Sequence, residues 1–232
     1  MSKVRISIGS AVIETGKPSL IVSIFDVDGL SLLRTFSSGA RKTDVLYEVR
    51  YDLFTQRSPD ALKHMVRKLL EMKIDFVFTF RTSDQAEAKA YYGAAVEAGC
   101  PAVDLDYTLL GSGITVPSGV AVIASMHLGP GESLGKSLET LERAPADLIK
   151  IAAWYQESDP FIRDMALVSE FKSRQGRPMA FIPMGKGSEF MRLVSACLIS
   201  DLNYVHDGQP TAVGQPELEE FRADLSRFFT RR

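Results

Sequence analysis

The sequence is poor in features that would anchor the chain in a membrane or link it covalently. Its 232 residues include only two cysteines, Cys100 and Cys197, which show neither metal-site spacing nor a framework of disulfide bridges. No apolar run approaches the roughly 20 residues that a membrane-spanning helix needs. Residues 1–6 lack the apolar core of a signal peptide. We therefore expect a soluble, cytoplasmic protein with reduced thiols and no membrane partner.

An excess of charge of one sign is also absent. The 27 Lys and Arg residues nearly balance the 29 Asp and Glu residues, and the net charge is -2. This balance leaves no electrostatic footprint for nucleic acid. The composition, 45% hydrophobic and 24% charged, is typical of a globular protein. The chain shows no linker and no repeat of fixed period, so residues 1–232 are expected to form a single domain.

Short apolar runs alternate with helical patterns along the chain. Residues 4–8 and 11–14 flank Gly9-Ser10 and predict an N-terminal hairpin. Buried strands are predicted at 20–24, 45–50, 76–80, 102–105, 121–125, 148–152, 179–182 and 202–205, and helices at 28–38, 58–72, 83–98, 133–143, 160–174, 188–198 and 216–229. Eight such units predict an α/β fold, a (β/α)8 TIM barrel with the hairpin closing its bottom. A doubly wound open sheet is the alternative, weakened because no G-x-G-x-x-G follows the first strand.

One predicted strand contains a lysine. Lys150 lies within Asp147-Leu148-Ile149-Lys150-Ile151-Ala152-Ala153, an otherwise apolar run. Burying an unpaired ammonium is costly, so a buried amine tends to lose its proton. A neutral amine in a pocket attacks carbonyls and forms Schiff bases. A lysine that snorkels to the rim or pairs with a carboxylate is the alternative.

Polar residues gather where the predicted strands end, which in a barrel is where chemistry takes place. They are Glu48, Arg50, Arg81, His127, Lys150, Arg192 and Gln215, and the apolar Met184 follows the seventh strand. Glu48 and Arg50 share one face of their strand because side chains alternate with a period of two. Each of these residues alone could be structural. Together, an amine, an imidazole and guanidinium groups at one barrel mouth suit an anionic carbonyl substrate.

The order and spacing of these residues resemble those of the type I 3-dehydroquinate dehydratase family, nearly from end to end. The matching segments are Glu48-Val49-Arg50-Tyr51-Asp52, Phe78-Thr79-Phe80-Arg81, Ser125-Met126-His127, Ile149-Lys150-Ile151-Ala152, Met184-Gly185 with Arg192, and Ala212-Val213-Gly214-Gln215. The resemblance implies a hydro-lyase of aromatic amino acid biosynthesis that needs no metal and no cofactor. It binds a small-molecule substrate, and a homodimer is left open.

The resemblance also implies a role for each matching residue. Lys150 would form the Schiff base with the substrate ketone, and His127 would act as the general acid and base. Glu48, Arg50 and Arg81 would bind the ring hydroxyls, and Met184 would line the pocket. Arg192 and Gln215 would hold the carboxylate, and Thr211 stands where the family has a serine.

Two departures from the family pattern concern the histidine. Leu128 follows His127 where the family has an aspartate, and a glutamate expected beside the histidine falls, on the spacing from Arg81, at Gln85. We expect Gln85 to face His127 across the barrel mouth. Two other functions are kept open: a class I aldolase acting on a small sugar phosphate, and a weakened barrel that only binds a ligand. Gly185-Lys186-Gly187 could serve the aldolase as a phosphate loop, although a lid or turn is the alternative.

Overall fold

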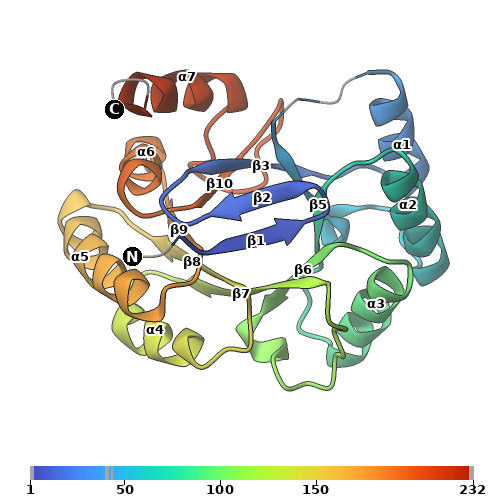
Figure 1. The fold of residues 1–232 in the computed structure, drawn as a ribbon, viewed down its shortest axis with the longest axis horizontal. Helices are drawn as coiled ribbons and strands as arrows, with labels where there is room; N and C mark the ends of the chain where they lie inside the picture. Colours follow the sequence, from blue (N-terminus) through green and yellow to red (C-terminus); the bar gives the residue numbers. More distant parts are fainter. Residues whose placement is uncertain (1–2, 40–41, 43, 230–232) are drawn as a thin grey trace.

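The computed structural model describes residues 3–39, 42 and 44–229, and it forms a (β/α)8 barrel (Figure 1). An antiparallel hairpin, β1 (Arg5–Ile8) with β2 (Ala11–Glu14), precedes the barrel. The barrel strands are β3 (Ser19–Ile24), β4 (Leu46–Arg50), β5 (Phe76–Thr79), β6 (Ala102–Asp106), β7 (Ala121–Leu128), β8 (Leu148–Trp154), β9 (Met179–Met184) and β10 (Leu202–Val205). Their spatial order is β10-β3-β4-β5-β6-β7-β8-β9, and every adjacent pair is parallel. The predicted fold is confirmed.

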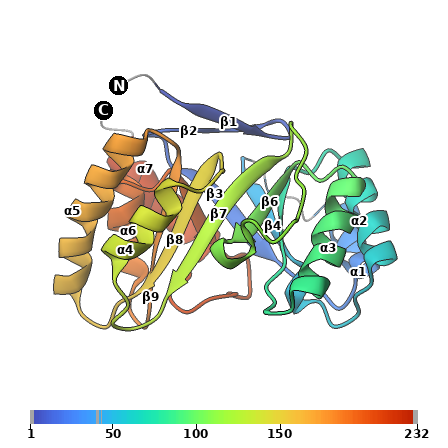
Figure 2. The same ribbon diagram turned by 90° about the horizontal axis from the view of Figure 1, so that it is seen from below.

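The helices lie outside the ring of strands (Figures 1 and 2). They are α1 (Gly29–Ser37), α2 (Pro59–Glu71), α3 (Gln85–Glu97), α4 (Leu134–Glu142), α5 (Ser158–Gln175), α6 (Glu189–Leu198) and α7 (Leu218–Phe229), with short 3-10 turns η1 (Tyr51–Leu53) and η2 (Tyr107–Leu109). Local signals set several boundaries. The Ser58 side chain caps the first turn of α2, as predicted, and Asp84 caps α3.

Three strands extend at least two residues beyond their predicted carboxyl ends. β7 continues to Leu128, β8 to Trp154 and β9 to Met184. His127 and Met184 were expected to follow their strands, and that expectation was wrong. The parallel ladder accounts for the extra length, because Met126, His127 and Leu128 pair with Ile151, Ala152 and Ala153 beyond the apolar runs.

The barrel interior changes from apolar at the amino ends of the strands to polar at the carboxyl ends. Successive inward positions on β4 are Leu46, Glu48 and Arg50, and on β8 they are Leu148, Lys150 and Ala152. Because side chains alternate with a period of two, an apolar floor residue on each of these two strands is followed by a charged one above it. The polar upper layer forms the site described below.

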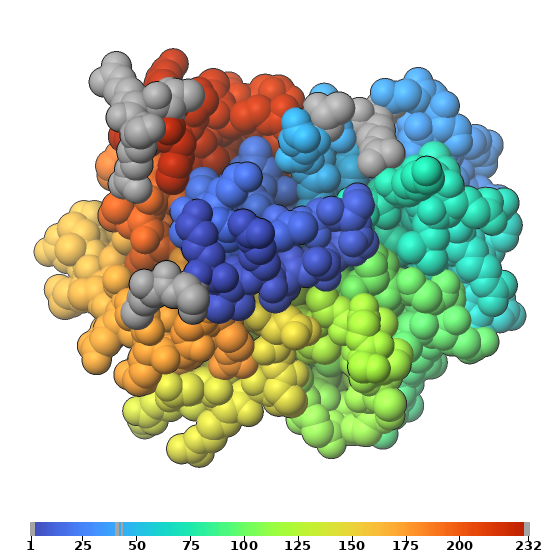
Figure 3. Space-filling model, in the orientation of Figure 1, coloured from blue at the N-terminus to red at the C-terminus, as the bar shows by residue number. Residues whose placement is uncertain are grey.

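The hairpin closes the amino end of the barrel. Figure 2 shows it lying across that end, and the space-filling view shows it covering the centre of the face (Figure 3). Ile8 and Ile13 are fully buried and pack into the cluster that fills the barrel floor. At the hairpin turn, Ser10 donates hydrogen bonds to both carboxylate oxygens of Asp75, at 2.8 Å from its backbone nitrogen and 2.6 Å from its hydroxyl. The floor is therefore both packed and hydrogen-bonded.

The barrel closes between β9 and β10, the seam of the barrel. Hydrogen bonds to side chains replace most of the backbone hydrogen bonds there. Asp201 N donates to Met179 O at 2.7 Å, and Met179 N donates to Asp201 Oδ2 at 2.9 Å. Phe181 N donates to Ser200 Oγ at 3.2 Å. Asp201 Oδ1 also accepts from Gly16 N at 2.7 Å and Lys172 Nζ at 2.6 Å. One buried carboxylate thus joins β9, the segment before β3, and α5 at the seam.

Among the helices that the structure describes, none is both long enough and apolar enough to cross a bilayer.

Candidate active site

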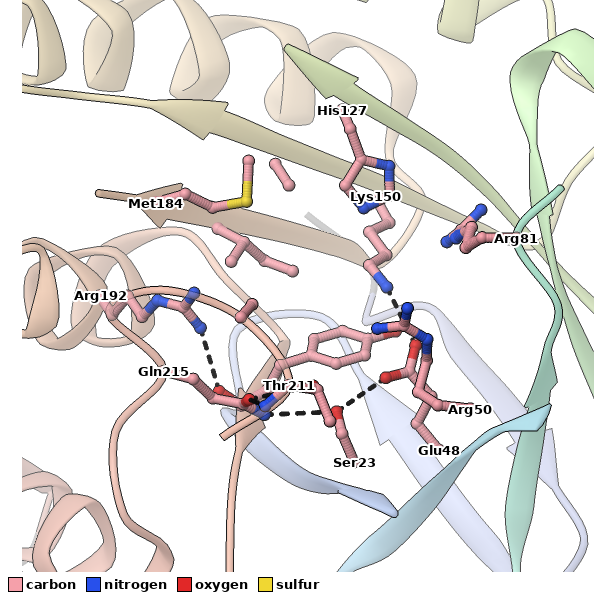
Figure 4. A pocket seen from close by; sticks show the side chains of 14 residues that line it. Ser23, Glu48, Arg50, Arg81, His127, Lys150, Met184, Arg192, Thr211 and Gln215 are labelled. Atoms are coloured by element: carbon pink, nitrogen blue, oxygen red, sulfur yellow. Dashed lines mark hydrogen bonds and ion pairs between the residues drawn. The ribbon is translucent and has the colours of Figure 1, made fainter. Parts of the chain in front are cut away.

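All nine residues predicted for the site line one cavity of about 280 Å³ at the carboxyl ends of the strands (Figure 4). They are Glu48, Arg50, Arg81, His127, Lys150, Met184, Arg192, Thr211 and Gln215. Ser23, Ala152, Ile182, Tyr204 and Ala212 complete the lining. The structure therefore brings together residues that lie as far apart in sequence as Glu48 and Gln215, while the role of each residue stays a prediction.

Lys150 is buried at the centre of the site and is held by two carboxylates. Its Nζ donates to Asp104 Oδ2 at 2.8 Å and to Glu48 Oε1 at 3.2 Å, and it lies 3.8 Å from the centre of the Tyr204 ring. Strand register explains the arrangement. Ser125 on β7 pairs with Lys150 on β8 and with Asp106 on β6, and Asp104 lies two residues before Asp106 on the same face of β6. The sequence left pairing and pocket chemistry as alternatives for this lysine. The structure shows it paired and lining the pocket.

Both carboxylates around the amine are tied to further groups. Glu48 accepts hydrogen bonds from Ser23 Oγ at 2.7 Å and Thr79 Oγ1 at 3.0 Å. Asp104 accepts from Arg81 Nη2 at 2.8 Å. Burial alone would raise the pKa of each carboxyl group, but Lys150 and Arg50 lower that of Glu48, and Arg81 and Lys150 lower that of Asp104. Both groups are therefore anions at neutral pH, and they hold the amine by charge as well as by hydrogen bonds.

His127 projects from β7 with 41% of its side-chain surface exposed. The surrounding barrel wall removes water from part of the ring, and Arg81 and Lys150 repel a proton. These effects lower the pKa of His127 from 6.5 to about 4, while Asp104 and Asp106 act in the opposite direction. The imidazole is therefore neutral at neutral pH and has a free lone pair with which to accept a proton.

Arg192 carries a buried positive charge with no carboxylate within ion-pair distance among the residues that the structure describes. It is 4% exposed, and its guanidinium donates to main-chain oxygens of Pro183 at 2.9 Å, Tyr204 at 3.2 Å and Val213 at 3.4 Å. Burial lowers the pKa of Arg192 to about 10, so the group remains charged at neutral pH. A buried, uncompensated guanidinium that lines a cavity favours an anionic ligand.

Gln215 and Arg50 are fixed by neighbouring groups. Gln215 Nε2 donates to Val205 O at 2.7 Å and Ser23 Oγ at 3.3 Å, while its Oε1 accepts from Thr211 N at 2.7 Å and Thr211 Oγ1 at 3.1 Å. Arg50 makes a two-pronged pair with Asp52, with Nε to Oδ1 at 3.0 Å and Nη2 to Oδ2 at 2.7 Å. Both side chains are thus held in position before any ligand binds.

Gln85 does not occupy the position that its spacing from Arg81 predicted. It is exposed at the first residue of α3 and is not among the residues that line the cavity. The reason is local, because Asp84 caps α3 through bonds to Ala86 N and Glu87 N, and this cap starts the helix outside the barrel mouth. The expectation that Gln85 faces His127 was wrong.

The sequence reasoning also missed Asp104 and Asp106. Asp104 is fully buried beneath the lysine, and Asp106 Oδ2 lies 4.0 Å from His127 Nδ1. The signal was present in Ala102-Val103-Asp104-Leu105-Asp106, where carboxylates alternate within a buried strand. It is the same kind of signal that drew attention to Lys150.

Metal ligands do not gather in the part of the chain that the structure describes: no three His, Cys, Asp or Glu side chains are placed to hold an ion.

The fold and the cavity define a (β/α)8 barrel with the features of an enzyme active site. A buried lysine, an imidazole and anion-binding groups lie together at the carboxyl ends of its strands. A family model described as Type I 3-dehydroquinase matches residues 30–230. The chain therefore belongs to the type I 3-dehydroquinase family.

Individual proteins agree with this assignment. The chain is similar to a 3-dehydroquinate dehydratase of Thermoplasma volcanium, with 34% identity over 224 residues that cover 97% of this chain and 95% of the relative. A 3-dehydroquinate dehydratase of Thermoplasma acidophilum is 31% identical over 225 residues, covering 97% and 96%. Among solved structures, the 3-dehydroquinate dehydratase of Geobacillus kaustophilus superposes with a TM-score of 0.85 at 20% identity, covering 98% of this chain and 97% of that one.

Proposed function

We propose that this chain dehydrates 3-dehydroquinate to 3-dehydroshikimate through a Schiff base on Lys150, as a step of the shikimate pathway. The observation that carries the proposal is the placement of Lys150 between two carboxylates, in one cavity with His127 and the uncompensated charge of Arg192. Family membership and the names of the two Thermoplasma relatives support the same substrate.

Imine formation is the first chemical step. The Lys150 ammonium loses its proton to water, and the neutral amine attacks the C3 ketone of the substrate. Loss of the carbonyl oxygen as water leaves a C=N bond to Nζ. The imine then acts as an electron sink, so a negative charge that develops at C2 becomes a neutral enamine.

Elimination follows with His127 as the group that moves the protons. The neutral imidazole takes a proton from C2, and the same ring delivers a proton to the departing C1 hydroxyl, which leaves as water. Hydrolysis of the conjugated imine releases the product and restores the amine. The pKa of about 4 suits the first transfer because the ring begins the cycle unprotonated.

Arg192 and Gln215 orient the substrate by holding its C1 carboxylate, with Thr211 fixing the amide of Gln215. Glu48, Arg50 and Arg81 face the ring hydroxyls, and Met184 forms an apolar wall. A guanidinium offers a planar fork that matches a carboxylate, which places C2 and C3 between His127 and Lys150.

The two other functions predicted from the sequence have less support. A class I aldolase acting on a sugar phosphate would need a phosphate site, but Gly185, Lys186 and Gly187 are not among the residues that line the cavity. A barrel that only binds a ligand would have no use for an amine and a neutral imidazole in one cavity. The cytoplasmic location, the single domain over residues 1–232 and the homodimer stay predictions.

Trapping of the imine tests the proposal. The purified chain is given 3-dehydroquinate, the conjugated enone is followed by absorbance, and borohydride is added during turnover. We expect product formation and one reduced adduct, mapped to Lys150 by mass spectrometry. Lys150→Gln should give neither, whereas Lys136→Gln, which changes an exposed lysine, should give both. An active enzyme without an adduct would rule out the imine, and an inactive wild-type chain would rule out the substrate.

A further inference from the structure

The carboxylate nearest to His127 comes from β6. Asp106 is the last residue of that strand, and its Oδ2 lies 4.0 Å from His127 Nδ1. Gln85, at the position from which the family pattern led us to expect an acidic partner, is exposed on α3. We infer that Asp106 is the positioning residue of His127, holding the ring with its proton on Nδ1 so that Nε2 is free to act as the base. This inference rests on the proposed function.

Asp106 is held so that one oxygen remains available. Its Oδ1 accepts hydrogen bonds from Thr108 N at 3.0 Å and from Thr108 Oγ1 at 2.7 Å. These two bonds hold the carboxylate at the start of η2 through Oδ1, and Oδ2 is the oxygen that lies within 4.0 Å of Arg81 and His127. The available oxygen therefore has a defined direction before any substrate binds.

Oδ2 of Asp106 lies near two groups, Arg81 and His127, but makes a hydrogen bond to neither. Arg81 Nη1 is 3.9 Å from Oδ2, and it is buried with no hydrogen-bond partner among the described residues. His127 Nδ1 is 4.0 Å from the same oxygen. Both distances exceed hydrogen-bond range by about 1 Å, a gap that catalytic pairs commonly close when substrate binds. With 41% of its side-chain surface exposed, His127 has room for its ring to turn toward Asp106.

The other charged groups that face His127 cannot take this role. Asp104, also on β6, is already bonded to Lys150 and Arg81. Arg81, after β5, and Lys150, on β8, are cations that repel the protonated ring. Asp106 is thus the carboxylate with a free oxygen near Nδ1, and its charge stabilises the imidazolium that forms when Nε2 accepts the C2 proton.

The orientation of the ring decides whether the base works. A carboxylate can only accept a hydrogen bond, so it requires the proton on Nδ1 and leaves the lone pair on Nε2. An amide in the same place can donate instead, which stabilises the opposite tautomer and puts the proton on the nitrogen that should be the base. Asp106→Asn therefore changes the tautomer while keeping the size of the side chain.

Three variants and two readouts test the inference. Nitrogen-15 chemical shifts of His127 should show the proton on Nδ1 in the wild-type protein and a mixture of tautomers in Asp106→Asn. Asp106→Asn should also lower kcat by roughly 10- to 1,000-fold with a smaller change in KM, since general acid–base catalysis contributes about 10²- to 10⁴-fold. Gln85→Glu is the matched control, and it should change neither the tautomer nor kcat.

The variant Asp106→Glu shows whether residue 106 orients the ring of His127 through its carboxylate or only packs beside it. A side chain longer by one methylene can reach toward Nδ1, so this variant should keep the wild-type tautomer and move the acidic limb of kcat/KM to higher pH, because a closer carboxylate raises the pKa of the ring. The inference is overturned if Asp106→Asn keeps the wild-type tautomer and kcat, or if Asp106→Glu fails in the same way as Asp106→Asn. The tautomer readout needs no turnover, so it stands apart from the question of whether the chain accepts 3-dehydroquinate.

Discussion

At the scale of the residue, Arg192 gives the clearest test of ligand charge. Removing one partner from a desolvated charge pair costs roughly 2–5 kcal/mol. At 1.36 kcal/mol per decade, Arg192→Ala should lower kcat/KM about 30- to several-thousand-fold. Arg192→Lys should recover only part of this loss, because an ammonium lacks the guanidinium fork.

Steady-state kinetics with circular dichroism check this prediction. Arg163 is exposed on α5, so Arg163→Ala should leave the kinetics unchanged and serves as the control. A folded Arg192→Ala variant with wild-type kcat/KM would place the substrate carboxylate elsewhere.

Single residues also show where sequence reasoning succeeded and where it failed. Lys150 was found because a charge in an apolar strand is unusual, and all nine predicted site residues line the cavity. Gln85 was misplaced because counting from Arg81 cannot reveal where a helix cap turns the chain outward. Asp106 was missed because its proximity to His127 depends on the register of β6 against β7. That register cannot be read from the sequence of either strand alone.

At the scale of the element, the hairpin turn depends on one glycine. Gly9 has φ +63°, and a Cβ there would overlap Asp75 Oδ1, the oxygen that accepts from Ser10 N. Gly9→Ala should therefore strain the backbone and displace Asp75, lowering the free energy of unfolding by roughly 2 kcal/mol.

Gly16→Ala is the matched control for the hairpin, because Gly16 has φ +80° but no atom within 4 Å of its added Cβ. That variant should lose only the backbone part, about 1 kcal/mol. Urea unfolding of both variants gives the difference between their free energies of unfolding. That difference measures the contribution of the contacts between the hairpin turn and Asp75. Equal losses of stability in the two variants would show that the contacts with Asp75 contribute nothing measurable.

Elements were predicted better than their ends. The alternation of apolar runs and amphipathic segments gave the number, type and order of the strands and helices. The carboxyl ends of β7 and β9 were placed too early, because His127 interrupts the apolar pattern of β7 and Pro183 breaks the strand pattern of β9. His127 is polar and lines the candidate cavity, so in β7 the apolar pattern ends where the strand reaches the site.

At the scale of the whole molecule, closure of the barrel depends on Asp201. Its carboxylate is 1% exposed and accepts from Gly16, Lys172 and Met179. Asp201→Ala would leave an amine and two backbone donors without their partner, and breaking a buried pair of this kind costs roughly 3–5 kcal/mol.

Asp147→Ala is the control for the seam. Asp147 is exposed and accepts a single backbone bond, from Val122 N at 2.8 Å, so its loss should cost about 1 kcal/mol. Thermal or urea unfolding of both variants measures the contrast. If Asp201→Ala is no less stable than Asp147→Ala, the packing of β9 against β10 closes the ring without the carboxylate.

Because the charge of Arg192 is uncompensated, the stability of the folded protein depends on whether an anionic ligand is bound, and its lifetime depends on the ligand concentration. An empty folded molecule keeps a desolvated cation that the unfolded chain exposes to water, whereas a bound carboxylate neutralises it. A ligand at 100 times its Kd, if it binds only the folded state, adds about 2.7 kcal/mol to the free energy of unfolding. Molecules without substrate unfold more often and are exposed more often to proteases. Abundance of the enzyme would then follow the concentration of the compound it consumes, without any separate regulator.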